Sequence, residues 1–205
     1  MTGLFVTLEG IDRSGKTSQA HRLVEKLGQD AVAVREPGGT AAGERIRELL
    51  KDPAAAIEPR TEALLFAAAR AELVAQVIRP ALAEGRVVVC DRYVDSSLAY
   101  QGAARGLGVD EVARLNEWAT GGLMPDLTIL LQLDPDLARA RAGDRDRFED
   151  EGASLQRAVA EAYERLAAAD PRRWRRVDAS RPVEEVHADV VKLVEAARAG
   201  AGAAA

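Results

Sequence analysis

The chain has 205 residues, of which 47% are hydrophobic and 30% are charged, a composition typical of a single globular domain. Its formal net charge of −5 argues against a nucleic-acid-binding surface, and no apolar run approaches the roughly 20 residues that cross a bilayer. Its single cysteine, Cys90, excludes an internal disulfide and favours a cytoplasmic protein.

Five apolar runs are suited to buried parallel strands, the last being the weakest: Leu4–Leu8, Ala31–Val34, Val87–Cys90, Leu127–Leu133 and Trp174–Val177. Helical spacing separates them, at Gln19–Leu27, Thr61–Glu84, Val109–Thr120, Pro135–Ala142, Ser154–Ala169 and Pro182–Ala197. Pro80 should kink or end the first part of the long helix. The alternation predicts an α/β fold, a five-stranded parallel sheet flanked by helices, within one domain over residues 1–198. The Ala/Gly tail over 199–205 should be disordered.

The segment Gly10–Thr17 matches GxxxxGK[ST] and follows the first strand directly, just before a helix. Such a loop turns its N–H groups toward phosphate oxygens, and the helix N-terminus adds partial positive charge. Lys16, one of 4 Lys against 24 Arg, would bridge the β- and γ-phosphates, and Thr17 would ligate Mg²⁺. The motif predicts a P-loop NTPase fold with ATP and Mg²⁺ as cofactors. The nucleotide-binding residues would be Gly10, Ile11, Asp12, Arg13, Ser14, Gly15, Lys16, Thr17 and Ser18.

The P-loop is shared by GTPase switches, motor ATPases and small-molecule kinases. A GTPase reads guanine with Asn-Lys-x-Asp, and the only Asn of this chain, Asn116, is followed by Glu117. A motor ATPase would need a larger body. A kinase of small substrates therefore remains, and its acceptor site must lie elsewhere in the chain.

Further motifs follow in chain order, at Arg35–Thr40, Phe66–Arg70, Asp91–Tyr93, Ser96–Ser97 and Tyr100–Gly102. With the phosphate loop, this set resembles the thymidylate kinase family, and order and spacing agree through Pro125–Thr128 and Asp146–Glu149. The resemblance implies direct in-line transfer of a phosphoryl group from Mg-ATP to dTMP, giving dTDP for dTTP synthesis, in a homodimer. Two alternatives stay open: a kinase for another nucleoside monophosphate, and a P-loop sensor that phosphorylates nothing.

Phe66 and Arg70 are four residues apart, so on a helix they share one face, and an aromatic ring with a guanidinium could hold a flat base. Asp91 ends an apolar strand at the edge of the sheet where ligands bind, within reach of Mg²⁺ near Thr17. The resemblance implies that Phe66 stacks on thymine and that Arg70 hydrogen-bonds its carbonyl. By the same resemblance the acceptor residues are Asp12, Glu36, Pro37, Phe66, Arg70, Arg92, Ser97, Tyr100 and Gln101.

More specifically, the resemblance places Arg92 on the acceptor phosphate, Tyr100 under the deoxyribose, and Asp12 at the sugar hydroxyl. An arginine-rich run that includes Arg139 and Arg147 predicts a lid over ATP at about residues 143–152. Arg139 would contact ATP. Either Arg13 or Arg147 would supply the transition-state contact, so the predicted catalytic residues are Asp12, Arg13, Lys16, Arg92 and Arg147.

Overall fold

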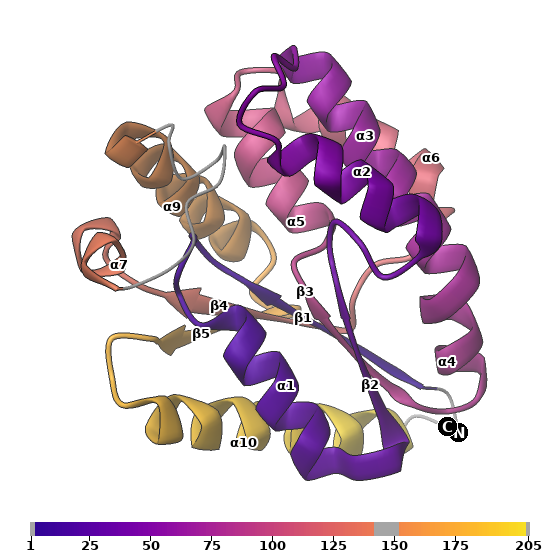
Figure 1. The fold of residues 1–205 in the computed structure, drawn as a ribbon. Helices are drawn as coiled ribbons and strands as arrows, with labels where there is room; N and C mark the ends of the chain where they lie inside the picture. The colour runs from indigo at the N-terminus through magenta and orange to yellow at the C-terminus, as the bar shows by residue number, and fades with distance from the viewer. Residues whose placement is uncertain (1–2, 142–151, 204–205) are drawn as a thin grey trace.

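The computed structural model describes residues 3–141 and 152–203 of the chain. Five parallel strands form one sheet in the order β2-β3-β1-β4-β5 (Figure 1). Their bounds are β1 Leu4–Glu9, β2 Ala31–Arg35, β3 Val87–Asp91, β4 Leu127–Gln132 and β5 Trp174–Asp178. The predicted five-stranded parallel sheet is confirmed, and each predicted strand is found within one residue of its expected bounds.

Helices cover both faces of the sheet, with α1 and α10 below it and α2, α3, α5 and α6 above it in Figure 1. The α-helices are α1 Lys16–Leu27, α2 Ala41–Lys51, α3 Pro59–Leu73, α4 Arg79–Ala83, α5 Val94–Ser97, α6 Val109–Thr120, α7 Pro135–Ala140, α9 Gly152–Ala169 and α10 Val183–Ala203. Two π-helical segments, Val74–Ile78 and Leu98–Ala104, and a 3₁₀ turn at Gly28–Asp30 complete the described elements. None of the described helices is long and apolar enough to cross a membrane.

The three central strands β1, β3 and β4 are buried on both faces, as parallel strands between two helical layers must be, whereas the edge strands β2 and β5 are partly exposed. Every residue of β1 is buried. Val6 and Leu8 belong to one apolar cluster together with Leu23 of α1, whereas Phe5 belongs to a second cluster with Leu73 of α3. Alternate side chains of β1 thus pack against both helical layers. This packing holds β1, and with it the end of the strand at which the next loop begins.

Helix α2 was not predicted. The side-chain oxygen of Thr40 caps it by accepting a hydrogen bond from Gly43 N at 3.0 Å. Among its residues only Gly43 and Leu50 are buried, but Ile46, Leu49 and Leu50 stand at helical spacing and form a short apolar stripe. This spacing and the threonine cap before it were the available signals.

The long predicted helix is divided before Pro80, because the π-helical segment Val74–Ile78 separates α3 from α4. Proline has no N–H to donate to the carbonyl four residues earlier, which favours an irregular turn just ahead of it. At the C-terminus, α10 continues through Ala203, into the tail over 199–205 for which disorder was predicted, and residues 204–205 lie outside the described residues. Alanine, the best helix former, prolongs the helix there.

Candidate active site

The phosphate loop occupies residues 10–17 between β1 and α1, and its two glycines are required by its shape. Gly10 has φ 144°, and a Cβ there would lie 2.7 Å from the carbonyl oxygen of Leu131. Gly15 begins the helix with φ 97°. Arg13 also takes a positive φ, 62°, which non-glycine residues rarely adopt outside functional loops. The backbone conformation of the loop therefore explains why glycine stands at positions 10 and 15 of the motif.

Lys16 bends back over its own loop. Its Nζ donates to the carbonyl oxygen of Ile11 at 2.7 Å and lies 3.3 Å from the Ser14 hydroxyl. Burial, with Arg92 adding to the effect, lowers the pKa of Lys16 to about 8, although nearby carboxylates oppose the shift. An ammonium group is thus held where the loop would receive phosphate.

Thr17 and Asp91 meet beside the loop, and the Thr17 hydroxyl donates to the Asp91 carboxylate. The parallel register places Leu8 opposite Asp91, so the β3 carboxylate lies at the level where β1 turns into the loop. Hydroxyl and carboxylate oxygens suit Mg²⁺, which typically takes one or two protein oxygens and completes its shell with water and substrate phosphate. The described residues contain no cluster of three or more potential metal-ligating His, Cys, Asp or Glu side chains.

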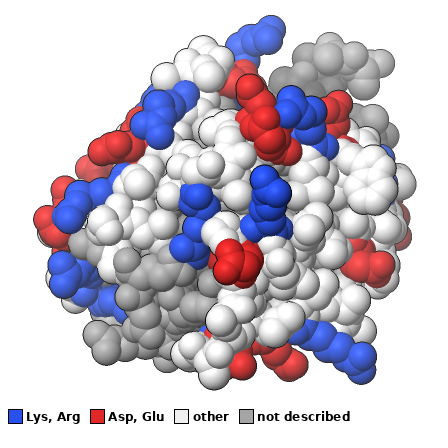
Figure 2. Space-filling model, turned by 90° about the horizontal axis from the view of Figure 1, so that it is seen from above, with Lys and Arg blue, Asp and Glu red and all other residues white. Residues whose placement is uncertain are grey.

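A cavity of about 350 Å³ opens directly from the phosphate loop. Basic side chains gather around an acidic one near the centre of the face seen from above (Figure 2). The structure brings most of the predicted site residues to this cavity, namely Asp12, Arg13, Lys16, Thr17, Glu36, Pro37, Phe66, Arg70, Asp91, Arg92, Ser97, Tyr100 and Gln101. Four further lining residues were not predicted: Arg35, Arg47, Lys51 and Ser96.

Arg92 stands at the mouth of the loop with φ 68°. One of its terminal nitrogens pairs with the Asp12 carboxylate, and the other donates to Gly10 O at 3.2 Å. Its guanidinium lies 5.1 Å from the centre of the Tyr100 ring, within cation–π range. Burial disfavours the charged form of Asp12, but Arg92 and Lys16 outweigh it and lower the pKa of that carboxyl. A charged pair therefore faces the cavity beside the loop.

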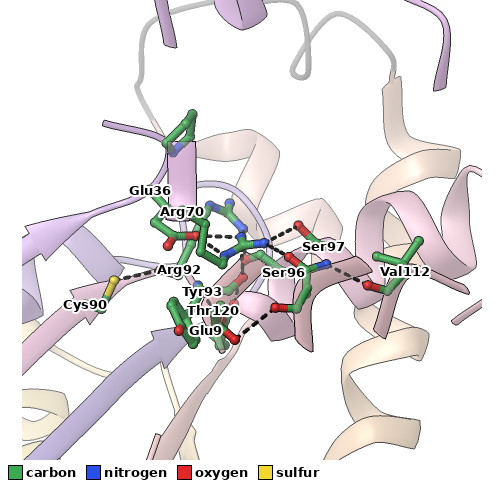
Figure 3. Close-up of polar contacts among 12 residues, drawn as sticks. Glu9, Glu36, Arg70, Cys90, Arg92, Tyr93, Ser96, Ser97, Val112 and Thr120 are labelled. Atoms are coloured by element: carbon green, nitrogen blue, oxygen red, sulfur yellow. Dashed lines mark hydrogen bonds and ion pairs between the residues drawn. The ribbon is translucent and has the colours of Figure 1, made fainter. Parts of the chain in front are cut away.

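Arg70 is buried and committed to protein groups (Figure 3). Its Nε donates to Glu36 at 2.7 Å, one terminal nitrogen contacts Ser97 at 3.1 Å and also Asn116, and the other contacts the Tyr93 carbonyl at 3.0 Å. Each of its nitrogens thus has a protein partner. The predicted hydrogen bond from Arg70 to the base stays a prediction, whereas its role in holding the cavity wall is visible directly.

Glu36 is the carboxylate that forms an ion pair with Arg70. Burial raises the pKa of Glu36 to about 7, although Arg70 opposes the shift. Its Oε1 is buried without a hydrogen-bond partner among the residues that the structure describes. The Glu36–Pro37 peptide bond beside it is cis.

Glu9, at the end of β1, is a buried acid that the sequence reasoning missed. It accepts hydrogen bonds from Tyr93 N at 2.8 Å, from the Ser96 hydroxyl at 2.6 Å and from the Tyr163 hydroxyl at 2.8 Å. Burial, reinforced by the nearby Asp95, raises the pKa of Glu9 to about 7. A glutamate closing an apolar strand just before the phosphate loop was the signal in the sequence.

Gln156 of α9 was missed as well. It brackets Asp12, accepting a hydrogen bond from its backbone N at 3.2 Å and donating to its carboxylate at 2.6 Å. Nothing in the local sequence indicates a contact across so many residues.

On the other side of the loop, Arg13 and Arg141 exchange hydrogen bonds. Arg13 donates to the Arg141 carbonyl at 2.9 Å, and Arg141 donates to the Arg13 carbonyl at 3.1 Å. Together with residues 14–19, they line a second cavity. Arg139 is exposed on α7 and does not line this cavity, whereas Arg141 and Arg181 do. Arg145, Arg147 and nearly all of the predicted lid lie outside the described residues.

Comparison with known proteins places these features in a family. The family model for thymidylate kinase matches residues 8–190. A thymidylate kinase of Leifsonia xyli is 53% identical over 195 residues, covering 92% of each chain, and one of Symbiobacterium thermophilum is 51% identical over 198 residues, covering 94% of this chain and 92% of the relative. A crystal structure of thymidylate kinase from Ehrlichia chaffeensis aligns with a TM-score of 0.77 at 31% identity, covering 95% of this chain and 99% of the other.

Proposed function

The chain belongs to the thymidylate kinase family, whose members phosphorylate dTMP to dTDP at the expense of ATP, and from that premise we propose how its residues divide this work. One observation carries the assignment. A single cavity runs from Lys16 and Thr17 of the phosphate loop to Phe66 and Gln101, so a phosphoryl donor and an aromatic acceptor fit end to end.

The acceptor dTMP lies in this cavity with its phosphate toward the loop. Arg92 clamps the phosphate, because its fork already lies beside Asp12 and Gly10 at the loop mouth. Phe66 stacks on thymine and Tyr100 packs under the deoxyribose. The remaining acceptor contacts come from Asp12 at the sugar hydroxyl and from Glu36, Pro37, Arg70, Ser97 and Gln101 around the base and sugar.

ATP lies with its phosphates on residues 10–18, and Lys16 neutralises the β- and γ-phosphates. Thr17 and Asp91 supply the protein oxygens for Mg²⁺. Bound there, the metal ion would neutralise phosphate charge and align its oxygens. The second cavity, on the far side of the loop, accepts the rest of the ATP molecule, with Arg141 along its wall.

The transfer itself needs alignment and charge neutralisation more than covalent chemistry. An oxygen of the acceptor phosphate is already a nucleophile, so it attacks the γ-phosphorus of ATP directly and ADP leaves. Arg13 contacts the migrating phosphoryl group, with Arg147 of the lid as its partner in that role. The lid, at about residues 143–152, excludes water from the transfer and keeps ATP from being hydrolysed.

The chain works as a cytoplasmic homodimer in this proposal. Its one thiol, Cys90, is buried and belongs to no disulfide, which suits a reducing compartment. The helices α2, α3 and α6 lie together above the sheet (Figure 1). Each of them exposes a large apolar side chain: Leu49, Leu64 and Trp118. Trp118 is 84% exposed, and an indole so placed is typical of a contact surface.

The experiment is a coupled assay that measures ADP release with ATP, Mg²⁺ and each of dTMP, dUMP, dCMP, dGMP and AMP. The proposal expects the highest kcat/KM for dTMP. A higher value for another monophosphate would make the chain a kinase of that acceptor. Tight binding of dTMP without ADP release would instead support the sensor interpretation.

A further inference from the structure

A buried carboxylate, Glu62, lies one helical turn before Phe66 on α3 and is 1% exposed. Arg105, which directly follows the π-helical segment Leu98–Ala104, binds this carboxylate with Nε 3.1 Å from Oε1 and Nη2 3.1 Å from Oε2. The second partner is Gln101, whose Nε2 donates to Glu62 Oε1 at 2.8 Å. Gln101 is also almost fully buried, and it lines the acceptor cavity beside Phe66.

The identity of the Gln101 partner determines which way the amide faces. An isolated glutamine amide can turn over and exchange its N–H₂ donor for its oxygen acceptor. A carboxylate only accepts hydrogen bonds, and Glu62 is ion-paired with Arg105. The amide nitrogen of Gln101 must therefore face Glu62, and the group that it presents toward a base is its oxygen.

The two pyrimidine bases differ at the atom that such an oxygen would meet. Thymine and uracil carry an N3–H donor, whereas N3 of cytosine is an unprotonated acceptor. An amide oxygen attracts the first and repels the second, and a site built for one hydrogen-bonding pattern strongly rejects the opposite one.

We propose that Glu62 is a positioning residue for acceptor specificity: it locks Gln101 so that its oxygen accepts from N3–H, favouring dTMP over dCMP. This inference rests on the proposed function, because it takes Gln101 to lie at the base. Glu62 touches no substrate and acts only through the amide. Its partner Arg105 holds the carboxylate in place by two hydrogen bonds.

The direct test is Glu62→Gln, with kcat/KM measured for dTMP, dUMP and dCMP. A neutral amide at 62 can accept from or donate to Gln101, so both orientations become available. We expect the dTMP/dCMP ratio to fall about tenfold or more, while the dTMP/dUMP ratio stays within twofold, since both bases carry N3–H. Glu72→Gln, the same change at the Gln76-paired Glu72 on α3, should leave both ratios at wild-type values.

Two further variants separate polarity from packing. Arg105→Lys removes the fork but keeps the positive charge, so we expect lower thermal stability with the dTMP/dCMP ratio preserved. Combining Glu62→Gln with Gln101→Glu reverses the pair: residue 62 now donates, and residue 101 again offers an acceptor oxygen to the base. The ratio should recover at least severalfold from its value in Glu62→Gln.

The inference is overturned if Glu62→Gln lowers kcat/KM equally for all three acceptors, or if Arg105→Lys shifts the ratio as much as Glu62→Gln does. Either result would leave Glu62 as an anchor for Arg105 alone. Failure of the proposed function gives a different result, because the wild-type protein would then show no preference for dTMP. Circular dichroism and the melting temperature of each variant establish that folded protein is being compared.

Discussion

The phosphate loop and the acceptor cavity adjoin each other but are built from different parts of the chain. The loop is one short segment, and its lysine bonds a carbonyl five residues away. The cavity wall depends on long-range contacts, such as Arg70 with Asn116, 46 residues apart, and Gln101 with Glu62, 39 residues apart. The shape of the phosphate loop is thus determined by the backbone of one segment. The shape of the acceptor cavity is determined by contacts between buried polar and charged side chains from several segments.

This difference has consequences for mutagenesis. A substitution in the loop should remove one function and leave the remainder of the molecule intact. A substitution among the buried charges of the cavity should affect folding and both substrates together, because each charge neutralises another. The predictions below test that contrast.

Lys16→Ala should give the largest effect on turnover. The loop should keep its shape, and kcat should fall by about a hundredfold or more, since a charge on the transferring phosphates is lost. The affinity for dTMP, measured by calorimetry, should change little. Lys26→Ala, an exposed lysine in the last turn of the same helix, is the matched control. If Lys16→Ala kept more than a tenth of the wild-type kcat, the assignment of the loop would be wrong.

Phe66→Ala should weaken the acceptor alone. Stacking on a base contributes roughly 1–3 kcal/mol, so KM for dTMP should rise about ten- to hundredfold while KM for ATP stays near wild type. Thr61→Ala, an exposed change on the same helix, should alter neither value. Equal increases in both KM values would assign Phe66 to packing.

Arg70→Ala tests the buried charges of the cavity wall, because it leaves the buried Glu36 without its ion-pair partner. Breaking a buried ion pair costs about 3–5 kcal/mol, so the free energy of unfolding in urea should fall by that order. Phe66→Ala should lose less. A stability of Arg70→Ala equal to that of wild type would contradict the structural role of the pair.

Tyr100 tests whether its ring or its hydroxyl selects the sugar. The hydroxyl lies 3.3 Å from Arg92 Nη2, and the ring lines the cavity. If the ring leaves no room for a 2′-hydroxyl, Tyr100→Ala should lower the ratio of kcat/KM for deoxy over ribo acceptors by about tenfold, and Tyr100→Phe should preserve it. An unchanged ratio in Tyr100→Ala would mean that the ring does not exclude ribose.

Glu9 tests a different property, the pH dependence of stability. Burial raises its pKa from 4.5 to about 7; the surrounding charges are Asp95, which raises it further, and Arg92, which lowers it, with Lys16 also nearby. The folded protein therefore binds this proton more tightly than the unfolded chain does. The stability that Glu9 contributes is complete below pH 4.5 and is lost as the pH rises to about 7.

The measurement is urea denaturation of wild type and Glu9→Gln between pH 4.5 and 7. The wild-type free energy of unfolding should fall, relative to the variant, by about 1 kcal/mol per pH unit. Glu161→Gln, an exposed change on α9, should follow the wild-type curve. Parallel curves for wild type and Glu9→Gln would show that Glu9 stays ionised throughout this range.

Much of this protein could be predicted from its sequence, because the responsible signals are local. Apolar runs predicted all five strands within a residue, since strands of a parallel sheet covered by helices are rich in apolar residues. The phosphate loop was predicted from its motif, because its glycines, lysine and threonine all lie within residues 10–17. The motifs after β2 and β3 were assigned to one site by the family resemblance, and the parallel sheet brings the carboxyl ends of both strands to one edge. Helix α2 was missed, although its threonine cap and the spacing of Ile46, Leu49 and Leu50 are local signals as well.

Tertiary structure alone decided how the buried polar groups pair. No local pattern indicates that Arg70 is surrounded by Glu36, Asn116 and the Tyr93 carbonyl, or that Glu62 holds the amide of Gln101. Such pairings join residues far apart in the chain, and each exists because a polar group removed from water must find a partner wherever the fold supplies one. The residue types at the site follow from the sequence, and the direction in which each donor and acceptor faces follows from the fold.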